Sequence, residues 1–350
     1  MNYKPLGRTG LNVSAIGLGT MTWGEQNTEA QAHEQLSLAV DAGVNLIDTA
    51  EIYPVPPKPE TAGRTEAYIG SWLKAQPSRR GKVVLATKAA GPARQAARPT
   101  HIRGGATSFT RANLEQAVND SLRRLNTDVI DLYQLHWPDR STNSFGQRGV
   151  TQLVQEDTVP IGETLQALDA IVRSGKVRHV GVSNETPWGL AQFLAASAQH
   201  DWVRVASIQN PYSLLNRSFE VGLSEFALRE QVGLLAYSPL AFGALSGKYL
   251  AGLRPAGARL TLYERFARYN GEHVERVIAG YVRLFRAHGI DPAQGALAFV
   301  NQRPFVASTL IGATTTDQLR SNLASAELVL SAELLAAIDA LHARHPDPAP

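Results

Sequence analysis

The chain contains no cysteine among its 350 residues, and this absence restricts its chemistry. Without thiols it can form no disulfide, no zinc-thiolate site and no thiol nucleophile. Neither a His-x-His nor an HExxH spacing occurs, which disfavours a metal-dependent hydrolase. Any reaction centre must therefore be built from oxygen and nitrogen groups.

Long apolar runs are also missing. The longest uncharged stretch, residues 232–247, is interrupted by Gly233, Pro239 and Gly243. It is shorter than the roughly 20 apolar residues that a membrane-spanning helix requires. The first ten residues, MNYKPLGRTG, lack the apolar core of a signal peptide, so we expect a cytoplasmic protein.

Dense runs of like charge are absent as well. The net charge is +3, and the basic residues are scattered, so we expect neither a nucleic-acid nor a membrane partner. The richest basic cluster lies in a stretch with glycine and proline and comprises Arg94, Arg98, His101, Arg103 and Arg111. Such a cluster could receive a phosphate, but its setting favours a solvated surface loop.

Short apolar or β-branched runs alternate with longer amphipathic stretches along the chain. The strand candidates are residues 13–20, 44–49, 82–88, 129–136, 178–183, 205–209, 232–238 and 306–312. The helix candidates are 29–41, 64–75, 110–125, 161–174, 187–199, 218–230, 272–287, 291–302, 315–325 and 331–343. Strand-helix alternation predicts a parallel sheet.

Eight such strands favour a closed (β/α)8 TIM barrel over an open, doubly wound sheet. We expect one domain over residues 1–350, with extra C-terminal helices. Residues 3–14 are predicted to form a β-hairpin that caps the barrel. The pair Gly17-x-Gly19 does not begin a Rossmann fingerprint, because the third glycine would fall at Thr22.

Four residues with acid-base chemistry fall at the ends of predicted strands: Asp48, Tyr53, Lys88 and His136. Strand ends on one face of a barrel meet over one pocket. Lys88 ends a strand with no charged residue in VVLAT before it, so it must find a charged partner or lose its proton, and Asp48 is suited as that partner. A unit charge about 4 Å from Tyr53 is worth about 4 kcal/mol, which would move its pKa from about 10 toward neutrality.

Any one of these residues could be structural, but the four together favour a reaction centre with Tyr53 as general acid or base. Three long connections, residues 54–63, 89–109 and 137–160, follow predicted strands and are expected to shape the site. Trp23, Trp137, Tyr212 and Asn216 are expected to line a pocket for a small carbonyl substrate.

Many segments resemble the aldo-keto reductase superfamily, in particular its bacterial Tas-type NADP(H)-dependent members. They include GLGTMTWGEQN (17–27), NLIDTAEIYPVPPKPET (45–61), LYQLHWP (132–138), GVSNET (181–186), IQNPYSLLNRSFEVGL (208–223), AYSPLAFGALSGKYL (236–250) and STLIGATTTDQL (308–319). The resemblance implies metal-free reduction of aldehydes or ketones by hydride transfer from nicotinamide C4. Tyr53 would donate the proton, Lys88 and Asp48 would tune the acidity of Tyr53, and His136 would orient the carbonyl.

The same resemblance implies an NADP(H) site along the strand ends. Ser183, Asn184 and Gln209 would bind the nicotinamide carboxamide, with Tyr237 stacked on the ring; ordinary strand capping is the alternative for the polar three. The pyrophosphate loop would comprise Ser238, Pro239, Leu240, Ala241, Gly243 and Lys248. The adenosine end would be bound by Gly312, Thr314, Gln318 and Asn322. Many relatives carry glutamate where this chain has Ser321; Arg320 would either compensate there or lie solvated on the helix.

Two other functions fit parts of the pattern. A lysine at a barrel strand end could form a Schiff base, as in an aldolase, although a paired Asp48 would keep Lys88 charged. The superfamily also resembles potassium-channel β-subunits, so a cofactor-binding, redox-sensing subunit is a non-enzymatic alternative. The four strand-end residues favour turnover.

Overall fold

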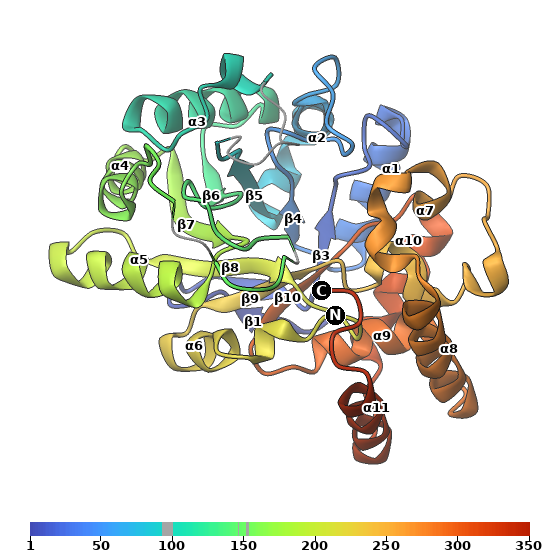
Figure 1. The fold of residues 1–350 in the computed structure, drawn as a ribbon. Coiled ribbons are helices and arrows are strands. Elements are labelled where there is room, and N and C mark those ends of the chain that lie inside the picture. The colour runs from blue at the N-terminus through green and yellow to red at the C-terminus, as the bar shows by residue number, and fades with distance from the viewer. Residues whose placement is uncertain (93–100, 146, 152–153) are drawn as a thin grey trace.

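Eight parallel strands close into a barrel that is surrounded by helices (Figure 1). The computed structural model describes residues 1–92, 101–145, 147–151 and 154–350. The barrel strands are β3 (Ile16–Gly19), β4 (Leu46–Asp48), β5 (Val84–Ala89), β6 (Ile130–Leu135), β7 (Val177–Ser183), β8 (Val205–Pro211), β9 (Gly233–Tyr237) and β10 (Val306–Ile311). Each strand pairs with the next along the chain, and β10 closes the ring on β3. The predicted (β/α)8 barrel is confirmed.

Helices follow the strands, and all except α7, which was not predicted, lie at nearly the predicted positions. They are α1 (Glu29–Asp41), α2 (Arg64–Ala75), α3 (Arg111–Leu125), α4 (Ile161–Arg173), α5 (Pro187–His200), α6 (Leu223–Glu230), α7 (Arg259–Leu262), α8 (Glu272–Ala287), α9 (Pro292–Asn301), α10 (Thr316–Ala324) and α11 (Ala332–Arg344). The start of α6 was predicted at residue 218, but a separate 3-10 turn occupies Ser218–Glu220. Within the described ranges, no helix is long and apolar enough to cross a membrane.

Side-chain caps explain where several helices begin. Thr28 accepts a hydrogen bond from the backbone N–H of Gln31, whose side chain in turn accepts from the N–H of Thr28. This reciprocal capping box satisfies two donors that would otherwise have no partner at the start of α1. Five later helices also begin with a side-chain cap, in which the N-cap residue accepts from a backbone N–H of the first turn. The caps are Thr110 for α3, Thr186 for α5, Asp291 for α9, Thr315 for α10 and Ser331 for α11.

The predicted hairpin is also present, and it closes the N-terminal end of the barrel. Strands β1 (Tyr3–Pro5) and β2 (Asn12–Ser14) pair antiparallel. At Gly7, in the turn, φ is +57° and a Cβ would lie 2.4 Å from the carbonyl oxygen of Ala206, so only glycine fits. Hairpin side chains complete an apolar floor inside the barrel, formed by Leu6, Val13, Leu46, Val84, Ala86, Leu132, Leu235, Ala307 and Leu310.

The inward-facing side chains change from apolar to polar toward the C-terminal ends of the strands. In β5 the face that carries Val84 and Ala86 continues to Lys88, because side chains alternate between faces every two residues. The parallel register sets Lys88 opposite Gln134 and Ser183 opposite Gln209. Polar groups from several strands therefore meet above the apolar floor, at the C-terminal ends of the strands, where the active sites of barrel enzymes lie.

The C-terminal end of the barrel is also crossed by the last residues of the chain. The backbone N–H of Arg217, in the connection between β8 and α6, donates to Asp347 Oδ1 at 2.5 Å. The N–H of Ala349 donates to the carbonyl of Leu215 at 3.1 Å. These two hydrogen bonds hold the last residues of the chain against the connection that follows β8.

Candidate active site

A fully buried ion pair forms the centre of the site. Lys88 Nζ lies 2.6 Å from Asp48 Oδ2, and the side chains are 0% and 3% exposed. The ammonium also donates to the carbonyl oxygen of Thr49 at 2.8 Å. Because Asp48 ends β4 and Lys88 lies near the end of the adjacent β5, the pairing predicted from their strand ends is confirmed.

Two amides hold the second oxygen of the Asp48 carboxylate. Oδ1 accepts from Gln209 Nε2 at 2.9 Å and from Gln134 Nε2 at 3.1 Å, and the two glutamines are themselves hydrogen-bonded at 3.1 Å. Gln134 was missed from the sequence. Its signal was a lone amide in an apolar strand, two residues before His136 and so on the same face.

Tyr53 and His136 complete the cluster. The Tyr53 ring centroid lies 5.0 Å from Lys88 Nζ and 5.7 Å from the His136 ring centroid, with the two rings edge to face. The backbone N–H of Tyr53 donates to Ala50, which places the ring just beyond β4. The backbone N–H of His136 donates to the carbonyl of Ala89 at the end of β5. The structure thus brings together the four residues expected at the strand ends.

The charge states differ in one respect from the sequence-based expectation. Burial raises the pKa of Tyr53; Lys88 lowers it, and Asp48 raises it further. The prediction that this pKa falls toward neutrality is wrong, because burial disfavours the phenolate and the carboxylate opposes the ammonium. Burial would lower the pKa of Lys88, but Asp48 and Tyr53 outweigh it, so that pKa is raised and the ammonium stays charged.

The aromatic residues expected around the substrate divide into two groups. Trp137 lies at the rim, 4.9 Å from the His136 ring and packed in a cluster with Ile52 and Tyr53. Trp23 is 1% exposed and donates its indole N–H to Gln35 on α1, so its predicted projection toward substrate is wrong. Tyr212 is likewise directed elsewhere, because its hydroxyl binds Glu220 at 2.5 Å and its ring packs on Phe299.

Asn184, expected at the nicotinamide carboxamide, connects three strand ends. Its Nδ2 donates to the carbonyl of His136 at 2.9 Å and to Ser183 Oγ at 3.2 Å, while Oδ1 accepts from the Tyr237 hydroxyl at 2.7 Å. Ser183 Oγ donates to the carbonyl of Gln209 at 2.8 Å. The strand-capping alternative therefore describes these contacts well, and a carboxamide contact stays a prediction.

The expected pyrophosphate loop follows β9 and ends at a cationic residue, Lys248. Residues from Ser238 through Gly247 include several with positive φ, among them Ala241 and Gly243. A Cβ on Gly243 would lie 2.8 Å from Lys248 Nζ, so the missing side chain makes room for the lysine. Burial lowers the pKa of Lys248, and this ammonium has no salt bridge among the described residues.

A second cation, Arg259 of α7, lies beside this loop and was not predicted. Its guanidinium is 5.2 Å from the Phe242 ring centroid, and Nη2 is buried with no hydrogen-bond partner in the part of the chain that the structure describes. Burial lowers its pKa to about 10. A guanidinium nitrogen that is buried without a hydrogen-bond partner is costly, so this arrangement suits a negatively charged ligand.

The expected adenosine segment lies at the start of α10, beyond the adjacent strand β10. Gln318 Oε1 accepts from both the backbone N–H and the hydroxyl of Thr314 at 3.1 Å, and Thr315 caps the helix. Asn322 is buried, whereas Gly312 and Arg320 are exposed. Ser321 accepts from Gln294 Nε2. The start of α10 is exposed and carries Asp317 in its first turn, and the adenosine contacts stay a prediction.

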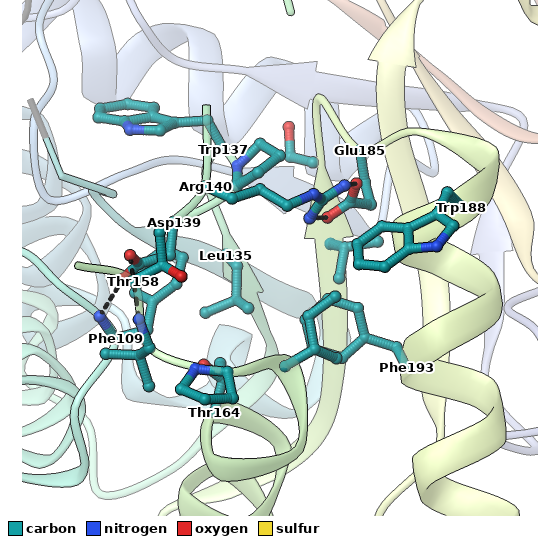
Figure 2. A pocket seen from close by; sticks show the side chains of 16 residues that line it. Phe109, Leu135, Trp137, Asp139, Arg140, Thr158, Thr164, Glu185, Trp188 and Phe193 are labelled. Carbon is teal, nitrogen blue, oxygen red and sulfur yellow. Dashed lines mark hydrogen bonds and ion pairs between the residues drawn. The ribbon is translucent and has the colours of Figure 1, made fainter. Parts of the chain in front are cut away.

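A separate cavity of about 120 Å³ lies outside the barrel wall, beside the ends of β6 and β7 (Figure 2). Its lining is largely apolar, and its central charges are paired: Arg140 Nη2 lies 2.6 Å from Glu185 Oε1, and the guanidinium stacks 4.8 Å from the Trp188 ring centroid. Trp137 and Ser183 are among the residues that line the cavity, whereas Asp48, Tyr53, Lys88 and His136 are not. The cavity therefore adjoins the reaction centre without containing it.

Comparison with known proteins assigns the family. The model of the aldo/keto reductase family matches residues 15–343, and the chain belongs to this family of oxidoreductases. It is similar to Protein tas of Escherichia coli strain K12, at 53% identity over 353 residues and 100% of both chains. It is 36% identical to the uncharacterized oxidoreductase YrpG of Bacillus subtilis, over 96% of this chain and 94% of the relative. An aldo-keto reductase of Babesia bovis is 38% identical over 69% of this chain and 88% of its own length.

Proposed function

We propose that the protein reduces aldehydes or ketones to alcohols with NADPH, using Tyr53 as the proton donor. The observation that carries this proposal is the convergence of a phenol, a buried Lys88–Asp48 pair and an imidazole at the C-terminal mouth of the barrel. Bound NADPH would supply the hydride, and the chain would supply orientation and the proton.

The residues suit the proton transfer in a defined way. Tyr53 is protonated before the reaction because its pKa is raised, and its phenolic proton would pass to the carbonyl oxygen as the carbonyl carbon accepts the hydride. Lys88 is fixed as an ammonium and stabilises the phenolate that forms. Asp48, held by Gln134 and Gln209, keeps that ammonium in place. His136, whose ring lies beside Tyr53, would orient the carbonyl oxygen.

The same charge states argue against Schiff-base chemistry. A nucleophilic amine must be neutral, but the pKa of Lys88 is raised by Asp48 and Tyr53. The Lys88–Asp48 pair at 2.6 Å therefore supports an electrostatic role for the lysine. A redox-sensing subunit would differ in showing cofactor binding without carbonyl turnover.

Two cations support the choice of a phosphate-bearing cofactor. Lys248 and Arg259 flank the loop after β9, and neither has a carboxylate partner among the residues described. A phosphate would supply the missing negative charge through charge-assisted hydrogen bonds. The exposed start of α10 follows the neighbouring strand β10 and offers a further anion site, which favours NADP(H) over NAD(H).

We expect Arg259→Met to weaken NADPH binding by about 10- to 100-fold, since a charge-assisted contact contributes roughly 1.5–3 kcal/mol. Titration of the purified protein with NADPH, NADP⁺ and NADH, followed by intrinsic fluorescence, measures the effect. Arg254→Met is the matched control, because this exposed arginine lies in the same connection between β9 and α8, and its only hydrogen bond within the described residues is to the carbonyl of Leu253. If the wild type binds none of the three nucleotides, the cofactor proposal is wrong; equal binding by the two variants would remove Arg259 from the site.

A further inference from the structure

A second buried ion pair lies beside the reaction centre, between residues that the reaction does not use. Arg103 Nη1 contacts Glu51 Oε2, and the two side chains are only 5% and 3% exposed. The other carboxylate oxygen of Glu51 accepts from the backbone N–H of Ala90 at 2.6 Å. The basic cluster around Arg103 was interpreted as a solvated loop; for Arg103 that interpretation is wrong, while Arg94 and Arg98 lie outside the described residues.

The Glu51–Arg103 pair joins three chain segments around Tyr53. Glu51 lies between Asp48 and Tyr53, and its backbone N–H donates to the carbonyl of Lys88 at 3.3 Å. Ala90 directly follows β5. Arg103 comes from the long connection before α3 and holds its own turn through an Nε contact to the carbonyl of Ala106 at 3.3 Å.

The backbone of Arg103 adds to the evidence that its side chain is held in place. Its φ is +46° and its ψ is +40°, a left-handed conformation that costs a non-glycine residue free energy unless surrounding contacts fix it. Its neighbour Ile102 packs in the rim cluster with Ala50, Ile52 and Trp137, against which Tyr53 lies. The pair therefore fixes a wall of the pocket in which the phenol stands.

Overall stability is a poor explanation for such a pair. Burial raises the pKa of Glu51, and Arg103 only offsets that effect. Buried ion pairs can often be replaced by apolar residues without loss of stability, because desolvation cancels much of the attraction. Glu51 accepts a hydrogen bond from Ala90 and pairs with Arg103, and these directional contacts set the position of the segment from Asp48 to Tyr53. Apolar side chains could not reproduce them.

We propose that Glu51 and Arg103 are positioning residues, whose ion pair holds the Tyr53 phenol in reacting distance of substrate without touching substrate or cofactor. The proposal rests on the carbonyl reduction proposed above. Displacement of a reacting group by about 1 Å can lower the rate by about 100-fold. Losing the pair should therefore lower kcat far more than it changes KM or cofactor binding.

The test compares Arg103→Met, Arg103→Lys and the double variant Glu51→Gln/Arg103→Met. Arg103→Met is expected to lower kcat by about 10- to 100-fold, with KM and the Kd for NADPH within about twofold. Arg103→Lys should recover part of the loss. The double variant also removes the Glu51 carboxylate that Arg103→Met leaves without its ion-pair partner. It should therefore be more thermally stable than Arg103→Met, while kcat stays low. Arg111→Met is the matched control, because its pair with Glu115 is exposed on the surface of α3.

Hydrogen-deuterium exchange supplies a readout that does not depend on turnover. Arg103→Met should speed exchange in peptides covering residues 49–53 and 101–106 relative to Arg111→Met. If kcat follows thermal stability in every variant, or if exchange in residues 49–53 does not change, the positioning role is overturned. A wild type without turnover would instead contradict the proposed reaction, and the exchange measurement would still decide whether the pair positions Tyr53.

Discussion

Tyr53→Phe is expected to lower NADPH-dependent carbonyl reduction by about 100- to 10,000-fold, the range for loss of a positioned general acid. The ring remains, so packing against Trp137 and Ile52 is kept, but no proton can be donated to the carbonyl oxygen. The loss corresponds to roughly 3–5 kcal/mol in transition-state stabilisation. Initial rates of NADPH oxidation with a panel of aldehydes and ketones measure it.

Tyr281→Phe provides the control for removing a buried tyrosine hydroxyl. Tyr281 is 1% exposed, and its hydroxyl has no hydrogen-bond partner within the described residues. We expect this variant to turn over like the wild type and to bind NADPH equally well. If Tyr53→Phe also retains wild-type rates, another group delivers the proton and the assignment of Tyr53 is wrong.

Lys88→Met is expected to lower the free energy of unfolding by about 3–5 kcal/mol, because it leaves the buried Asp48 carboxylate without its counter-ion. The lysine is 0% exposed, so solvent cannot take over from the ammonium. Carbonyl reduction by this variant should also be slower, since the phenolate of Tyr53 would form without a neighbouring positive charge. Urea unfolding followed by fluorescence gives the stability change.

The double variant Asp48→Asn/Lys88→Met separates this interaction from general damage. Because it removes both charges, we expect it to be markedly more stable than the sum of the single changes implies. Arg229→Met is the matched control, since its pair with Glu225 on α6 is exposed and should contribute less than about 1 kcal/mol. Additive effects of Asp48→Asn and Lys88→Met would show that the pair is not coupled as described.

The fold and the positions of the reacting groups were predictable because both follow from local periodicity. Apolar runs of strand length alternate with amphipathic segments, and only a barrel brings eight such strands into one closed sheet. Once the barrel is assigned, Asp48, Lys88 and His136 must meet, since each lies at the C-terminal end of a neighbouring strand.

What was missed depends on tertiary contacts that no local pattern encodes. Trp23 packs toward α1 because Gln35 accepts its indole N–H, and Arg103 is buried because Glu51 lies opposite it. The direction of the Tyr53 pKa shift required the balance of burial against two opposite charges. Arg259 was overlooked because α7 is a single short turn within a long connection.

Transfer of deuterium to a carbonyl substrate from NADPH that carries deuterium at both C4 positions of the nicotinamide tests the central claim most directly. The account predicts that the wild type converts an aldehyde to an alcohol carrying one deuterium on the former carbonyl carbon, as mass spectrometry of the product would show. Saturating NADPH binding without deuterated alcohol from any aldehyde or ketone would contradict the account, and would favour a cofactor-sensing protein.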